Sequence, residues 1–135
     1  MPNELSKKTY PDGTEVYFRD DTAREQIAEK SGVITLNSGW NFDSGVTNTV
    51  RRVGNIAWIS SYIYSTNALT AGTLYDVGTL PAGFIPSKTY VFPIYGSDSS
   101  TLNGVVTIGT DGKVKYKAVN TGRYAIYTTI MYPLS

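Results

Sequence analysis

The stretch Asn55-Ile-Ala-Trp-Ile-Ser-Ser-Tyr-Ile-Tyr-Ser65 decides the fold class of this chain. In a β-strand, alternate side chains point to opposite faces. One face of this stretch then carries Ile56, Trp58, Ser60, Tyr62 and Tyr64, and the other carries Ala57, Ile59, Ser61 and Ile63. Neither face holds a charge, and β-branched and aromatic residues dominate, which predicts a central strand covered on both sides. A helix is the alternative, but turn residues flank the stretch at Gly54-Asn55 and at Ser65-Thr-Asn67. We therefore expect Trp58 to be largely buried.

The same two-residue period continues from Val33 to the C-terminus and predicts about eight strands. Besides the central stretch, these are Val33–Trp40, Val46–Val53, Thr73–Leu80, Thr89–Tyr95, Leu102–Gly109, Lys113–Val119 and Arg123–Tyr132. Pro93 predicts an edge position or a bulge, because proline cannot donate to a ladder. Thr110-Asp-Gly112 is a strong hairpin signal. Strands at this spacing predict an all-β fold, an antiparallel β-sandwich of jelly-roll type.

Residues 1–32 differ from this body and are expected to form an N-terminal extension, leaving residues 33–135 as the sandwich domain. Tyr10-Pro-Asp-Gly13 predicts a turn, followed by a short extended run over Glu15–Phe18. Thr22 and Glu25 fit a capping box, which predicts a short helix with Gly32 at its C′ position. Two interpretations stay open. The helix either lies on the domain, or its Ala23/Ile27 face meets copies of itself in a trimeric neck.

Composition excludes several functional classes. The 135 residues contain no Cys and no His, so disulfides, thiolate chemistry and a His-activated serine are ruled out. No spacing resembles a calcium loop, and we expect neither a metal nor a cofactor. The net charge of +1 gives no electrostatic case for nucleic acid. No apolar run reaches the roughly 20 residues that span a bilayer. The N-terminus has no apolar core of a signal peptide, so we expect synthesis in the cytoplasm and no membrane insertion.

The carboxylates of the body do not suggest an enzyme. Residues 33–135 contain four of them, all aspartates: Asp43, Asp76, Asp98 and Asp111. Glycoside hydrolysis usually needs two carboxyl groups that face each other across the scissile bond. These four fall in separate loops, turns and a weak strand, and Asp111 is required by its hairpin turn. We expect binding without catalysis.

The aromatic residues are more informative about binding and assembly. The chain has 11 Tyr, and those of the body fall in or beside predicted strands. Tyrosine combines a large apolar ring with a polar tip and suits interfaces. Tyr62 and Tyr64 are candidates for a subunit interface. Tyr95 near Asp98, together with Asn67 in a loop of small residues, are candidates for a shallow saccharide site.

Several segments together resemble a known family. Gly54-Asn-Ile-Ala-Trp58, then Val77-Gly-Thr-Leu-Pro-Ala-Gly-Phe-Ile-Pro86, and then the hairpin at Asp111-Gly112 are similar to the C-terminal head domain of tailed-bacteriophage tail-fibre and baseplate receptor-binding proteins. Val16 to Lys30 resembles the shoulder or neck that precedes such heads. The resemblance covers about residues 15–135. It implies a homotrimeric antiparallel β-sandwich that sits in the virion with other tail or baseplate proteins and binds a saccharide of the host surface; it transfers no ligand residues.

Three functions follow from these observations. The first is a non-enzymatic, trimeric fibre tip that adheres to a host glycan. The second is a purely structural fibre or capsid-decoration domain, in which the aromatic residues make trimer contacts. The third, a polysaccharide depolymerase, is opposed by the absence of Glu from the body and of His from the chain.

Overall fold

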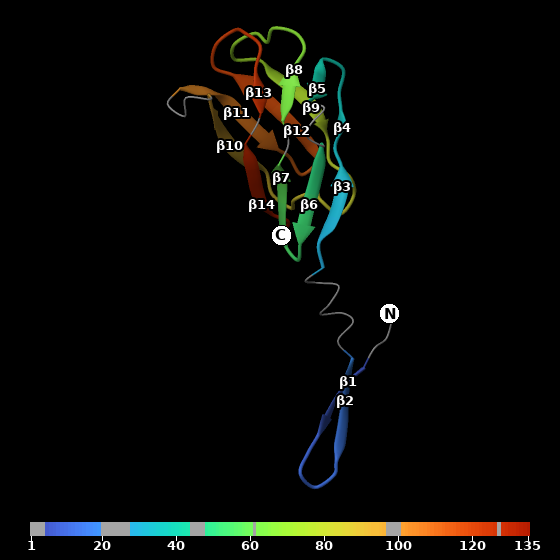
Figure 1. Ribbon diagram of the computed structural model, residues 1–135. Helices are drawn as coiled ribbons and strands as arrows, with labels where there is room; N and C mark the ends of the chain where they lie inside the picture. Colours follow the sequence, from blue (N-terminus) through green and yellow to red (C-terminus); the bar gives the residue numbers. More distant parts are fainter. Residues whose placement is uncertain (1–4, 20–27, 44–47, 61, 97–100, 127) are drawn as a thin grey trace.

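The protein is all-β, with antiparallel strands throughout the part of the chain that the computed structural model describes. That part comprises residues 5–19, 28–43, 48–60, 62–96, 101–126 and 128–135 (Figure 1). Within it there is no helix, and the head is built from 12 strands in three sheets. The predicted fold class is confirmed at this level.

An N-terminal hairpin forms a sheet of its own. Strand β1 (Leu5–Thr9) pairs with β2 (Glu15–Arg19). In the turn between them, the Tyr10 amide donates to the Thr14 carbonyl over 2.8 Å, and Gly13 adopts a φ of 87°. The predicted turn and extended run are confirmed. The partner strand β1 was not predicted, because its polar sequence lacks an apolar alternation.

Three antiparallel sheets make up the head. The four-stranded sheet has the order β14 (Thr129–Pro133), β7 (Ile56–Ser60), β6 (Thr49–Val53) and β3 (Lys30–Val33). The five-stranded sheet has the order β10 (Tyr90–Tyr95), β11 (Leu102–Ile108), β12 (Lys113–Ala118), β9 (Leu74–Thr79) and β4 (Thr35–Leu36). The three-stranded sheet has the order β13 (Ala125–Ile126), β8 (Ile63–Ser65) and β5 (Trp40–Phe42).

One hydrophobic cluster joins these sheets. It includes Val50 and Ile59 of the four-stranded sheet, Val106 and Tyr116 of the five-stranded sheet, and Ile63 of the three-stranded sheet. All of these side chains are buried. Two layers that bury their inner faces against each other are what a β-sandwich requires. The arrangement is therefore consistent with a β-sandwich.

The central stretch, predicted as one strand, forms two strands that lie in two different sheets. Neither is an edge strand of its sheet. β7 lies between β14 and β6, whereas β8 lies between β13 and β5. Its inner face is buried at Ala57, Ile59 and Ile63. The expectation that Trp58 is largely buried is confirmed in part: Trp58 is half-buried, but it does not belong to the core cluster. It stands on the opposite side of the strand from Ala57 and Ile59, where the described part of a single chain covers it only partly.

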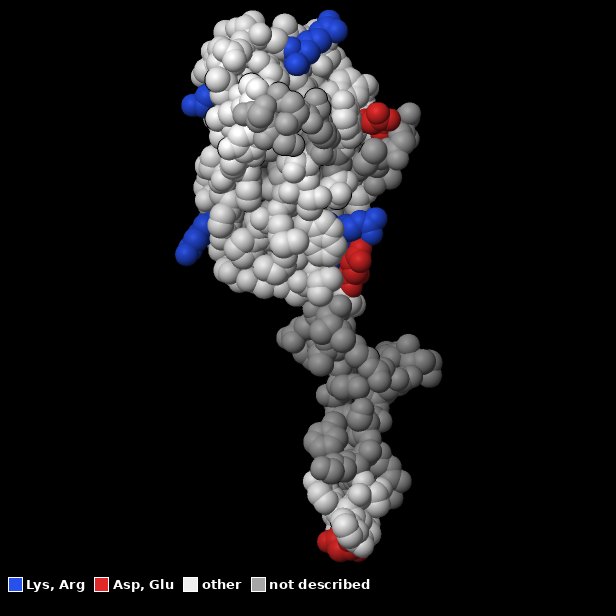
Figure 2. Space-filling model, turned by 60° about the vertical axis from the view of Figure 1, so that its left-hand side comes forward, with Lys and Arg blue, Asp and Glu red and all other residues white. Residues whose placement is uncertain are grey.

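Trp58 belongs to an apolar surface on the four-stranded sheet, which we call the outer apolar face. Residues directly opposite one another on paired strands share a face. Met131 on β14 lies opposite Trp58, and Ile56 lies opposite Val53. Met131 is 58% exposed and Ile56 is 40% exposed. The surface comprises Val33, Val53, Ile56, Trp58 and Met131. Figure 2 shows one side of the head, on which most of the described side chains are neither acidic nor basic.

The segment predicted as a first strand over Val33–Trp40 serves three sheets instead of one. β3 pairs with β6, β4 pairs with β9, and β5 pairs with β8. A turn separates the last two, in which the Trp40 amide donates to the Asn37 carbonyl and Gly39 has a φ of 91°. The prediction of one continuous strand is therefore wrong. The residues Asn37-Ser-Gly39 are typical of a turn, and they indicated a break in this strand.

β3 also corrects the end of the predicted N-terminal helix. Gly32 lies inside β3 opposite Val50 and is not a helix C′ residue. A Cβ at this position would meet Pro81 at 2.6 Å, so glycine is required for close packing and not for capping. Thr22, Ala23, Glu25 and Ile27 lie outside the described residues. β3 spans the expected boundary at residues 32 and 33, so the head sheets begin at Lys30.

From β9 to β12 the chain follows the predictions closely, but the prediction of one last strand over Arg123–Tyr132 is wrong, because β13 and β14 belong to two different sheets. In the β11–β12 hairpin the Asp111 carboxylate accepts a hydrogen bond from the Lys113 amide over 3.0 Å, and Gly112 has a φ of 81°. β10, which contains Pro93, is the edge strand of its sheet and has a register shift at Ile94/Tyr95. Turn residues specify the hairpin, and the missing amide hydrogen of Pro93 favours the edge position.

The Leu80–Ser87 segment, which carries part of the family resemblance, packs under the C-terminus. Phe84 is buried, and its carbonyl accepts a hydrogen bond from the Tyr132 hydroxyl over 2.8 Å. The Ser87 amide donates to the Leu134 carbonyl over 2.8 Å. This segment therefore has a structural role, since it joins the β9–β10 connection to the last strand.

Candidate ligand-binding groove

A groove of about 650 Å³ opens beside the three-stranded sheet. This sheet lies at the end of the head opposite the C-terminus (Figure 1). The described residues that line the groove come from the end of β5, from β8 and from the segment that leads into β13: Asp43, Tyr62, Tyr64, Ser65, Thr66, Arg123, Tyr124 and Ala125. Three segments far apart in the sequence therefore build one site.

Two tyrosines from β8 and the residues before it form the aromatic wall of the groove. Ile63 and Ser65 point inward and are buried, so Tyr62 and Tyr64 project to the other side of the strand. Their ring centroids are 6.2 Å apart at an interplanar angle of 59°. Both rings are half-buried. They offer apolar ring surface and a hydroxyl tip to a ligand.

The floor of the groove is held by backbone and hydroxyl hydrogen bonds. The Ser65 amide donates to the Tyr124 carbonyl over 2.8 Å, and the Tyr124 amide donates to the Ser65 hydroxyl over 2.9 Å. The Tyr124 hydroxyl donates to the Asn120 carbonyl over 2.6 Å. A floor fixed in this way does not have to be ordered when a ligand binds, which lowers the entropic cost of binding.

Aromatic packing connects this floor to the core. The ring of Tyr124 lies 5.9 Å from that of Tyr116, which in turn lies 5.9 Å from that of Trp40 in an edge-to-face arrangement. Tyr116 is fully buried, and this burial, with the nearby Tyr124 phenol as a smaller cause, raises its pKa to about 12. The Tyr116 hydroxyl is therefore neutral at physiological pH and takes no part in charge recognition.

A second hollow of about 470 Å³ adjoins the groove. Asn41, Phe42, Asp43 and Tyr64 line it, so the two hollows share Asp43 and Tyr64. The Asn41 side-chain oxygen accepts a hydrogen bond from the Phe42 amide over 2.9 Å, which leaves the Asn41 amide group for other contacts. Together the two hollows have room for more than one sugar ring, given that small-molecule sites typically measure about 300–1,000 Å³.

Among the described residues that line the groove, the charged groups are one carboxylate and one guanidinium. Asp43 follows β5, and its amide donates to the Tyr62 carbonyl over 3.1 Å. Arg123 is exposed and precedes β13. A carboxylate that accepts hydroxyl hydrogen bonds, a guanidinium that donates them, and aromatic rings between these groups are the chemistry of saccharide recognition.

The predicted saccharide candidates lie apart from this groove. Tyr95 is 51% exposed at the end of β10, the edge strand of the five-stranded sheet. Asn67 is exposed in the β8–β9 connection, one residue beyond Thr66. Neither is among the described residues that line the groove, and Asp98 lies outside the described residues. Tyr62 and Tyr64, predicted for a subunit interface, are the aromatic wall of the groove.

Sequence analysis missed Arg123 and treated Asp43 as an ordinary loop residue. A usable signal was present, because both residues directly adjoin aromatic strand segments. Proximity between residue 43 and residue 123 depends on two pairings, β5 with β8 and β13 with β8. Neither pairing is encoded locally.

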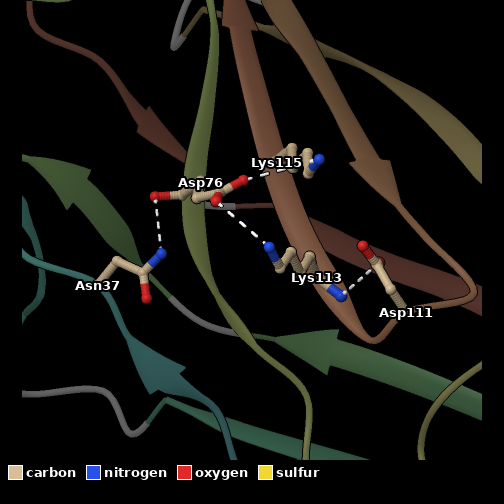
Figure 3. A network of polar contacts seen from close by, with 5 residues as sticks. All are labelled: Asn37, Asp76, Asp111, Lys113 and Lys115. Carbon is tan, nitrogen blue, oxygen red and sulfur yellow. Dashed lines mark hydrogen bonds and ion pairs between the residues drawn. The ribbon is translucent and has the colours of Figure 1, made fainter.

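A second polar cluster, on the five-stranded sheet, has a structural role. Asp76 on β9 lies 3.8 Å from the ammonium groups of both Lys113 and Lys115 on β12 (Figure 3). The Asp76 carbonyl also accepts from the Asn37 side chain over 3.4 Å. These pairs are exposed, so each contributes at most about 1 kcal/mol. The lysine row is thus a solvated strand face, as the alternation of Lys113, Lys115 and Lys117 indicates.

Within the described residues, no group of three or more Asp, Glu, His or Cys side chains is placed to hold a metal ion. No described helix is long and apolar enough to cross a membrane. Comparison with known proteins assigns no family: no protein-family model matches the chain, and no curated protein matches it either.

Proposed function

We propose that this chain is a non-enzymatic receptor-binding head of a tailed-bacteriophage fibre or baseplate, and that it binds a host-surface saccharide as a homotrimer. The observation that carries the proposal is the groove at the end of the head, where Tyr62 and Tyr64 stand between Asp43 and Arg123 over a hydrogen-bonded floor. The resemblance of the head segments to phage receptor-binding proteins supports the same function. Jelly-roll connectivity, a virion location and a neck helix that includes Ala23 and Ile27 are parts of this proposal.

The outer apolar face supports the trimer. Val33 is 60% exposed there and Met131 is 58% exposed, beside the half-buried Trp58. Contiguous exposed apolar side chains on a soluble protein mark interaction surfaces. Arg51 on β6 lies opposite Trp58 and so shares this face, where it pairs with Glu29 over 2.6 Å. Aromatic residues, methionine and arginine are enriched in protein interfaces.

The N-terminal hairpin supports attachment to other virion proteins. Within the described residues its strands pair only with each other. A two-stranded hairpin by itself is at best marginally stable in water. We therefore expect it to be stabilised by neighbouring copies or by tail and baseplate proteins.

Assembly alone is the second candidate function, since the outer apolar face would also suit a purely structural fibre domain. Host-cell adsorption and glycan-array binding separate the two functions when wild-type protein is compared with two variants. Tyr64→Ala removes half of the aromatic wall, while Tyr95→Ala removes an exposed tyrosine outside the groove and is the matched control. We expect Tyr64→Ala to weaken glycan binding roughly tenfold, about 1.4 kcal/mol, and Tyr95→Ala to leave it unchanged.

The same preparations test the trimer by sedimentation. Val33 and Val91 are both valines that are 60% exposed, but Val91 lies on β10 of the five-stranded sheet. Val33→Asp should dissociate the trimer, and Val91→Asp should not, because only Val33 belongs to the outer apolar face. A wild-type protein that binds no glycan and does not adsorb to host cells, while remaining trimeric, would favour the structural function. A wild-type monomer at micromolar concentration would refute the trimer.

A further inference from the structure

Among the residues that the structure describes, the guanidinium of Arg123 has no anionic partner. Arg123 is exposed, and it lines the groove together with Tyr62 and Tyr64. Among the described residues, the ion pairs join Arg51 to Glu29 and join Asp76 to Lys113 and Lys115, and none of them uses Arg123. No hydrogen bond within that same part of the chain uses its guanidinium either. The five N–H donors of Arg123 are therefore available to a ligand.

Asp43 lines the same groove as Arg123. Among the described residues, no ion pair joins these two charged groups. The groove therefore has two separate polar anchors of opposite sign, with a tyrosine wall beside them. A guanidinium prefers planar or tetrahedral oxyanions, which it binds through two parallel hydrogen bonds. A carboxylate prefers hydroxyl donors.

One class of ligand uses all three elements. The apolar face of a sugar ring packs on tyrosine, the ring hydroxyls donate to Asp43, and an anionic substituent of the sugar meets Arg123. A neutral saccharide would leave the charge of the guanidinium to solvent, so it would gain no charge-assisted hydrogen bond from Arg123. A polyanion such as nucleic acid would meet the Asp43 carboxylate, on a chain whose net charge is only +1.

We propose that the groove is selective for an anionic saccharide, and that Arg123 binds its carboxylate or phosphate oxygens. This inference rests on the proposed saccharide-binding function and adds the class of ligand. The two sources of the anion, a uronic acid and a phosphodiester-linked sugar or glycerol, present the same oxyanion chemistry to the guanidinium.

Binding is measured by calorimetry with three probes. These are a uronate-containing oligosaccharide, the same oligosaccharide with its carboxyl groups reduced to alcohols, and a glycerol-phosphate oligomer. We expect at least one anionic probe to bind about five- to tenfold more tightly than the reduced probe, because a charge-assisted hydrogen bond is stronger than a neutral one. The preference should shrink with rising salt, since the site is open to solvent. Which anionic probe binds identifies the source of the anion.

Two variants isolate the role of Arg123. Arg123→Gln should abolish the preference for the anionic probe and change the affinity for the reduced probe by less than about twofold. Lys88→Gln removes the same charge from an exposed lysine outside the groove and should keep the full preference. An unchanged melting temperature shows that each variant is folded.

The inference is overturned if the wild-type protein binds the reduced probe as tightly as the anionic probes, or if the preference survives in Arg123→Gln. These outcomes leave the proposed function standing as long as Tyr64→Ala still weakens binding to host glycans. Failure of the wild-type protein to bind any of the three probes or host envelope polysaccharide overturns both.

Discussion

Two fully buried tyrosines differ in one hydrogen bond, and that difference predicts opposite effects of the same substitution. Tyr116 and Tyr132 are 0% and 1% exposed. The Tyr132 hydroxyl donates to the Phe84 carbonyl over 2.8 Å. The buried Tyr116 hydroxyl has no hydrogen-bond partner in the described part of the chain. Tyr→Phe removes only the hydroxyl, so it isolates this group in both places.

The expected free energies have opposite signs. Burying a hydroxyl without a partner costs about 1–3 kcal/mol, and the small void that Tyr116→Phe leaves offsets part of the gain. We expect Tyr116→Phe to be neutral or up to about 2 kcal/mol more stable than wild type. Tyr132→Phe loses its hydrogen bond and leaves the Phe84 carbonyl unpaired, which should cost about 1–3 kcal/mol.

Urea unfolding at neutral pH measures the free energy of unfolding of both variants. The dependence of this free energy on urea concentration should be similar for the two. Tyr132→Phe is the internal control, since it reports what a satisfied hydroxyl contributes in the same core. The reasoning is refuted if Tyr116→Phe is destabilised as much as Tyr132→Phe. That result would mean that the Tyr116 hydroxyl is hydrogen-bonded in the folded protein.

Two further predictions concern the same core. Gly104→Ala should destabilise the protein by about 2–3 kcal/mol, because its Cβ would lie 2.6 Å from the Tyr116 ring and even closer to the Lys117 carbonyl oxygen. Gly122→Ala is the control, since its Cβ would meet nothing nearer than 3.6 Å. Thermal melts should show that this second substitution is tolerated. Alkaline pH should unfold the protein, because burial raises the pKa of Tyr132, and raises that of Tyr116 to about 12, above the ordinary value near 10. The unfolded chain then releases these protons first, so stability is intact below pH 10 and falls as the pH rises from about 10 toward 12. Tyrosine absorbance and circular dichroism measure the free energy of unfolding over this pH range. A free energy that stays constant would contradict the assignment of both phenols to the core.

Sequence alone predicted the parts of the fold that local chemistry specifies. The β11–β12 hairpin follows from Asp111-Gly112, since Asp111 caps the turn and Gly112 supplies the positive φ. β9, β10, β11 and β12 agree with the predicted strands to within one residue at each end. The edge position of Pro93 follows from its missing amide hydrogen.

Features that depend on long-range pairing could not be predicted in the same way. Residues 30–42 alternate well enough for one strand, yet β3, β4 and β5 are assigned to three sheets by their partners β6, β9 and β8. Alternation indicated correctly that Ala57 and Ile59 share a face with Ile63. It could not indicate which of the two apolar faces packs in the core, and so it did not show that Trp58 lies outside the core cluster. The groove needed the same long-range information, because Asp43 and Arg123 line one groove only since β5 and β13 both pair with β8.

The uncovered face of the central stretch connects the two proposed activities. Ile56 and Trp58 on β7 belong to the outer apolar face, and Tyr62 and Tyr64, further along the same stretch, form the wall of the groove. In the proposed trimer, the first pair is covered by neighbouring copies and the second pair stays open to the ligand. Three grooves are then held at fixed positions at one end of the assembly. Linked sites raise the overall affinity for a repetitive surface by about 10²–10⁴ over one site without any new contact. A shallow, open groove is therefore sufficient for adhesion as long as the trimer holds. This explains why Val33→Asp, which lies outside the groove, is expected to abolish host adsorption while each separate groove keeps its affinity for a soluble saccharide.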